Sequence, residues 1–104
     1  MTTVTASDLK AMRKHAGDAA SMLRALSHEA RLMVLCELAV GERTAGELVE
    51  RSGLSQSALS QHLTKLRDEG LVATRRDAQS IVYRIANPKA GRLLDVLHEI
   101  YCKR

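Results

Sequence analysis

The chain has 104 residues, a formal charge of +4 and a pI near 9.4, which fit one small domain (residues 1–104) with a polyanionic partner. It has no Phe or Trp and only two Tyr, so it lacks the aromatic platforms on which single-stranded nucleic acids stack. Because no stretch resembles a membrane span or a secretory signal, we predict a cytoplasmic protein with no membrane partner, whose two cysteines are free thiols.

Two helices are predicted in the first forty residues. From about Asp8 to Leu26, apolar residues recur with helical spacing, and alanines among them would let another helix approach closely. Ser27 is expected to cap a second helix that runs from His28 to about Val40 and ends at Gly41. The apolar stripe of this second helix is broad, which indicates that it is largely buried.

A short third helix and a longer fourth helix follow. Thr44 and Glu47 have the spacing of a capping box, so the third helix begins there, and Gly53 ends it. Ser55 is a good N-cap for a helix of about four turns that ends near Gly70. Two helices joined by a short turn that contains glycine are typical of a helix-turn-helix.

The fourth helix has a polar face suited to duplex DNA. Leu59, Leu63 and Leu66 share one face, and the opposite face offers hydroxyl and amide groups that match base edges in a major groove. We therefore predict a recognition helix, with an ordinary surface helix as the alternative. For His62, a packing role and a DNA role are both open. The residues predicted to lie at or near the bases are Gln56, Ser57, Ser60 and Gln61. Those predicted to lie nearer the phosphates are Thr64 and Lys65.

A β-hairpin and a last helix complete the predicted fold. Runs rich in β-branched residues at 71–74 and 81–85 predict the hairpin, and its tip carries Arg75 and Arg76. Both arginines are expected to reach phosphates or the minor groove, and a merely solvated hairpin is the alternative. Asn87 and Pro88 begin a helix that runs nearly to the C-terminus. The fold class is mainly α with a small β-hairpin, a winged helix-turn-helix of order α-α-α-α-β-β-α.

Three motifs resemble the ArsR/SmtB family of small bacterial repressors, and the resemblance covers almost the whole chain. They lie at Leu26–Leu32 (LSHEARL), Gly53–Leu63 (GLSQSALSQHL) and Leu66–Val72 (LRDEGLV). The resemblance implies a homodimer formed through the first and last helices. It also implies a repressor that binds a pseudo-palindromic operator in double-stranded DNA, needs no cofactor and is released by an inducer.

The two cysteines are the candidate sensor. Cys36 in the second helix and Cys102 in the last resemble the dithiol of the persulfide- and redox-responsive subgroup typified by the biofilm-growth-associated repressor and HlyU. That resemblance implies a persulfide, polysulfide or oxidant as inducer. The chemistry is attack by one thiolate and resolution by the second thiol. Lys103 and Arg104 would favour the Cys102 thiolate, whereas Glu37 and an apolar helix face would raise the pKa of Cys36, so we expect Cys102 to attack first.

Several alternatives stay open. Either cysteine alone could be a small buried hydrophobe. Some relatives bind metals through Cys-x-Cys, which is missing at Thr44–Glu47, and Asp95 with His98 does not close a tetrahedral zinc site. We therefore predict no metal, with a Cys36, His98 and Cys102 site as the alternative. An enzyme is not expected, because no phosphate-binding glycine loop or supported cysteine–histidine set occurs. A constitutive or protein-binding winged helix is the remaining alternative.

Overall fold

The computed structural model describes residues 3–102, and the predicted helices and hairpin are all confirmed. The helices are α1 (Ala6–Leu26), α2 (Glu29–Val40), α3 (Ala45–Ser52), α4 (Gln56–Asp68) and α5 (Pro88–Cys102), and the strands are β1 (Arg43–Thr44), β2 (Val72–Asp77) and β3 (Ser80–Ile85). The two-residue strand β1 was not predicted. It pairs with β3 and gives an antiparallel sheet of order β1-β3-β2.

The ends of α3 and α4 lie where the sequence places them. The Thr44 side chain accepts a hydrogen bond from the backbone N–H of Glu47, and the Glu47 carboxylate accepts one from the backbone N–H of Thr44, at 3.1 and 2.8 Å. Ser55 caps α4 in the same local way. Gly53 and Gly70 have φ of 71° and 74°, a left-handed backbone that favours glycine, and they terminate the two helices.

The first two helices begin at other residues than predicted. Thr5 and Asp8 form a capping box, so α1 starts at Ala6, before the predicted Asp8. The N-cap of α2 is His28 rather than Ser27, and its Nδ1 accepts a hydrogen bond from a backbone N–H at 3.2 Å. Ser27 makes a different hydrogen bond: its hydroxyl donates to the Arg24 carbonyl at the end of α1, at 2.7 Å.

The hairpin is longer than predicted and its tip is tighter. Arg75 is paired with Val82 and Arg76 with Ile81, so both arginines lie within β2 and not at the tip. The turn itself is formed at Ala78, which has φ of 57°, and the residue after it. A two-residue turn suffices for a hairpin, so strand pairing continues past the β-branched run into polar residues. The prediction that residues 75–80 form the tip is wrong.

An aliphatic core holds the helix-turn-helix and the hairpin together. It lies between α2, α3, α4, α5 and the sheet, and its largest fully buried side chains are Leu35, Leu48, Leu59, Leu66, Leu71, Leu94 and Val34. Burying one such side chain contributes about 1.5–3 kcal/mol. The apolar face of α4 is therefore anchored, and its opposite face is left to solvent.

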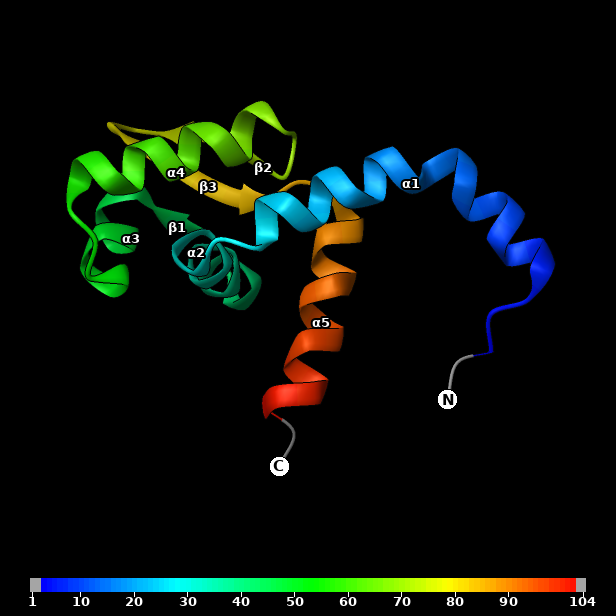
Figure 1. Ribbon diagram of the computed structural model, residues 1–104. Helices are drawn as coiled ribbons and strands as arrows, with labels where there is room; N and C mark the ends of the chain where they lie inside the picture. Colours follow the sequence, from blue (N-terminus) through cyan, green and yellow to red (C-terminus); the bar gives the residue numbers. More distant parts are fainter. Residues whose placement is uncertain (1–2, 103–104) are drawn as a thin grey trace.

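α1 and α5 extend away from this core (Figure 1). The N-terminal half of α1 passes beyond the other elements, and the C-terminal half of α5 runs away from the sheet. The molecule accordingly measures 51 × 33 × 22 Å. Large apolar side chains stay exposed on both helices, namely Leu9, Met12, Leu23, Val96, Ile100 and Tyr101. Within residues 3–102, no helix is both long and apolar enough to span a bilayer.

Candidate DNA-binding surface and cysteine pair

α4 presents its predicted polar residues together on one exposed surface. Gln56, Ser57, Ser60, Gln61, Thr64 and Lys65 are all exposed. The opposite face of the helix is buried, since Leu59, Leu63 and Leu66 are at most 3% exposed. Lys65 also forms an ion pair with Glu69, one turn further along, at 3.4 Å. An exposed pair of this kind contributes only about 0.3–0.5 kcal/mol, so Lys65 can exchange it for a phosphate.

His62 packs α4 against the start of α2. Its ring lies 4.6 Å from the ring of His28, at an interplanar angle of 55°. Burial lowers the pKa of His62, and the positive charges of His28 and Arg31 lower it further. A half-buried imidazole held between two helices favours the packing role over the DNA role.

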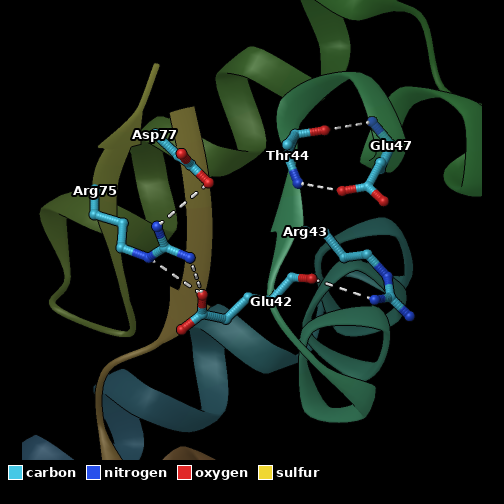
Figure 2. A network of polar contacts seen from close by, with 6 residues as sticks. All are labelled: Glu42, Arg43, Thr44, Glu47, Arg75 and Asp77. Atoms are coloured by element: carbon cyan, nitrogen blue, oxygen red, sulfur yellow. Dashed lines mark hydrogen bonds and ion pairs between the residues drawn. The ribbon is translucent and has the colours of Figure 1, made fainter. Parts of the chain in front are cut away.

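The two wing arginines have different surroundings, and Figure 2 shows those of Arg75. Arg75 donates to one carboxylate oxygen of Glu42, from Nη2 at 2.7 Å and from Nε at 3.3 Å. Its Nη1 lies 3.8 Å from the Asp77 carboxylate, and the hydrogen bonds to Glu42 raise the pKa of Arg75. Arg76 is exposed on the other face of β2, and no ion pair involves it among residues 3–102. Both arginines are exposed, but Arg75 is held by two carboxylates of the protein, whereas Arg76 has no such partner among residues 3–102.

The sequence did not indicate that Glu42 would contact the wing. It lies in the connection between α2 and β1, 33 positions before Arg75. No local pattern relates the two residues. Only the pairing of β1 with β3 brings the connection beside the hairpin.

Cys36 and Cys102 lie on two helices that contact each other, α2 and α5. Cys36 on α2 is half-buried, Cys102 at the end of α5 is exposed, and both are free thiols. Burial raises the pKa of Cys36, and the nearby charges of Cys102 and Glu37 raise it further. His98, one turn before Cys102 on α5, contacts the Cys36 sulfur, so Cys102 lies on the side of α5 that faces Cys36. The predicted help from residues 103 and 104 lies outside the described residues.

His98 lies within hydrogen-bonding distance of the Cys36 sulfur. Its Nε2 lies 3.3 Å from Cys36 Sγ, across the contact between α5 and α2. Over the described part of the chain, no three His, Cys, Asp or Glu side chains are arranged to hold a metal ion. The contact of Cys36 with His98 joins two of the three residues that the metal alternative names.

A helix-turn-helix with an exposed polar second helix, followed by a three-stranded wing, defines a winged-helix DNA-binding protein. Residues 28–74 match the family model described as bacterial regulatory protein, arsR family. The biofilm growth-associated repressor of Agrobacterium fabrum is 48% identical over 90% of this chain and 80% of its own length. The chain therefore belongs to the ArsR family of bacterial regulatory proteins.

Two solved structures show how far the likeness extends. Reduced HlyU from Vibrio cholerae has a TM-score of 0.84 and 43% identity, and the match covers 89% of this chain and 98% of that one. The winged helix-turn-helix domain of Mb0332 from Mycobacterium bovis, described as homodimeric, has a TM-score of 0.76 and 27% identity, over 99% and 92% of the two chains. The chain is thus a DNA-binding transcriptional regulator, and the relatives named in these matches are regulators rather than enzymes.

Proposed function

We propose that this regulator is a homodimeric repressor that leaves its operator when oxidised sulfur species modify the Cys36 and Cys102 dithiol. The observation that carries the proposal is the neighbourhood of the two cysteines. Cys36 lies on α2, behind the helix-turn-helix, and Cys102 lies on α5, on the side of that helix whose His98 contacts Cys36. The likeness to HlyU and to a biofilm growth-associated repressor supports it.

The apolar surfaces of α1 and α5 support a homodimer. A hollow of about 680 Å³ opens between them, and apolar side chains such as Met12, Met22, Leu93 and Val96 line it. A second copy would cover this surface, and the Mycobacterium bovis relative is described as homodimeric. Two-fold symmetry would then place the recognition helices in successive major grooves, about 34–36 Å apart. That spacing matches a pseudo-palindromic operator.

The exposure of the two thiols supports an order of reaction. Exposed Cys102 attacks the outer sulfur of a persulfide R–S–SH, displaces RS⁻ and becomes Cys102–S–SH. Cys36, whose raised pKa keeps it protonated, must lose its proton before it reacts. Its thiolate attacks Cys102 Sγ, displaces HS⁻ and closes a disulfide. Further sulfur transfer before closure would give a longer bridge.

A bridge between these cysteines would tie α2 to α5. α2 packs against α3 and α4, and α5 belongs to the proposed dimer surface. A covalent link between them biases the placement of the two recognition helices relative to each other. Couplings of this kind are about 1–3 kcal/mol, which corresponds to roughly 5- to 150-fold in affinity.

Operator titration with and without inducer tests the proposal. The probe is the DNA upstream of the protein's own gene, measured by fluorescence anisotropy before and after treatment with glutathione persulfide or hydrogen peroxide. We expect the wild type to lose at least tenfold in affinity, and Cys36→Ser and Cys102→Ser to keep theirs. Release of the double Cys→Ser variant by the same treatment would contradict dithiol sensing.

Mass spectrometry of the two single variants tests the order of reaction. We expect Cys36→Ser to acquire a persulfide on Cys102 quickly, and Cys102→Ser to react slowly at Cys36. Initial modification confined to Cys36 would reverse the order.

A further inference from the structure

Cys36 has a potential base in direct contact. The Nε2 of His98 lies 3.3 Å from Cys36 Sγ, within the range of a hydrogen bond to sulfur, and both side chains are half-buried. His98 reaches this position from α5, and Cys36 from α2. With the proton of the neutral imidazole on Nδ1, Nε2 is free to accept one from the thiol.

The reaction requires a base at this sulfur. A thiolate attacks sulfur and a thiol does not, and burial keeps Cys36 in its thiol form. The adjacent carboxylate of Glu37 is turned to another partner, since its Oε2 lies 3.8 Å from Arg51 on α3. Among the described side chains, the His98 imidazole is the one within hydrogen-bonding distance of the sulfur.

The geometry points to His98 as the base that takes the proton from Cys36 as this sulfur attacks modified Cys102. This role rests on the proposed dithiol function. In the step, the Cys36 S–H bond breaks and its proton moves to His98 Nε2. A bond forms between the two Sγ atoms, and the bond from Cys102 Sγ to the leaving sulfur breaks. The electron pair of that bond departs with the leaving thiolate, RS⁻, or HS⁻ from a persulfide.

The placement of His98 on α5 suits this step. His98 and Cys102 are four residues apart on one helix, so they lie on the same side of it, one turn apart. The base and the sulfur under attack are therefore presented to Cys36 by a single rigid element. A general base positioned in this way accelerates a step by about 10²–10⁴-fold.

Thiolate release from 5,5′-dithiobis(2-nitrobenzoate), the aromatic disulfide used as probe, tests the proposal. With one equivalent per chain, the first aromatic thiolate reports modification of Cys102. The second appears only when Cys36 attacks the mixed disulfide. We expect His98→Ala to leave the first phase unchanged and to slow the second at least tenfold. Imidazole added to the buffer should restore much of the second phase.

Two control variants define the result. Cys36→Ser should show the first phase alone, and Glu99→Ala, at an exposed position next to His98 on α5, should keep both phases. A second phase of unchanged rate in His98→Ala would overturn the role of His98. So would a slowed phase that imidazole does not restore, because His98 would then act only through packing. Wild-type protein that releases the first thiolate and never the second would instead refute the dithiol bridge itself.

Discussion

Arg75 of β2 and Glu42 of the α2–β1 connection form an ion pair. The Nη2 and Nε of Arg75 donate hydrogen bonds to the same carboxylate oxygen of Glu42, at 2.7 and 3.3 Å. Both side chains are about half exposed, so the pair adds at most about 1 kcal/mol to stability. Its functional consequence is larger. A basic side chain of the wing is held by the protein's own carboxylate, in competition with any DNA phosphate.

Removing the Glu42 charge should strengthen DNA binding. We expect Glu42→Gln to raise affinity for duplex DNA several-fold at low salt and to steepen the salt dependence by about one counterion, because Arg75 becomes available to a phosphate. Fluorescence titrations at several salt concentrations measure both effects. Glu50→Gln on α3 makes the same change in net charge and is the matched control. Equal effects of the two variants would mean that only net charge matters.

The two wing arginines should differ in their contribution to binding. Arg76→Ala is expected to reduce the salt slope by about one and to weaken binding to all sequences alike. Arg75→Ala should reduce the salt slope and the affinity by smaller amounts, because Glu42 already balances the charge of Arg75. The same salt series, run on operator and on unrelated DNA, gives the comparison. A greater loss with Arg75→Ala would show that the ion pair opens on DNA.

Gln61 should contribute to sequence preference rather than to general affinity. Its amide lies on the exposed face of α4 and can form a bidentate contact with adenine. We expect Gln61→Ala to lose about 1–3 kcal/mol of discrimination between operator and unrelated DNA, with little change in its affinity for unrelated DNA. Competition between operator and random duplex measures it. Parallel losses on both DNAs would exclude a base contact.

His62 should make stability depend on pH. Burial lowers its pKa from the ordinary value of 6.5, so the unfolded chain binds the proton more readily. The folded state is therefore favoured fully above about pH 6.5, and this contribution is lost as pH falls through the lowered folded pKa. We expect His62→Gln to flatten the fall in Tm below neutral pH, and His15→Gln on α1 to leave it intact. An identical slope in His62→Gln would contradict the packing role.

The capping box of α3 should support the helix-turn-helix. Thr44→Ala removes the acceptor for the Glu47 N–H and should cost about 0.5–2 kcal/mol in the free energy of unfolding. Thr44→Ser keeps that acceptor and should recover most of the loss. Urea denaturation at one fixed protein concentration compares the three proteins. If Thr44→Ser loses as much as Thr44→Ala, the methyl group rather than the cap is what matters.

The sequence by itself determined the ends of α3 and α4 and the exposed face of α4. Caps and glycines act within three or four residues, as Ser55 does on Ala58, so their effect can be read locally. The helical period likewise separates the buried Leu59, Leu63 and Leu66 from the polar face. These features also carried the family resemblance, which the comparisons confirm.

Only the tertiary structure decided which distant residues meet. β1 has two residues and exists because β3 offers it an edge, and no propensity within Arg43–Thr44 predicts it. The contact of Arg75 with Glu42 spans 33 positions, and that of His98 with Cys36 spans 62. Such pairs follow from how α2, α5 and the sheet pack on the shared leucine core. Periodicity places a side chain on a face of its own helix, but packing alone determines which side chain lies opposite.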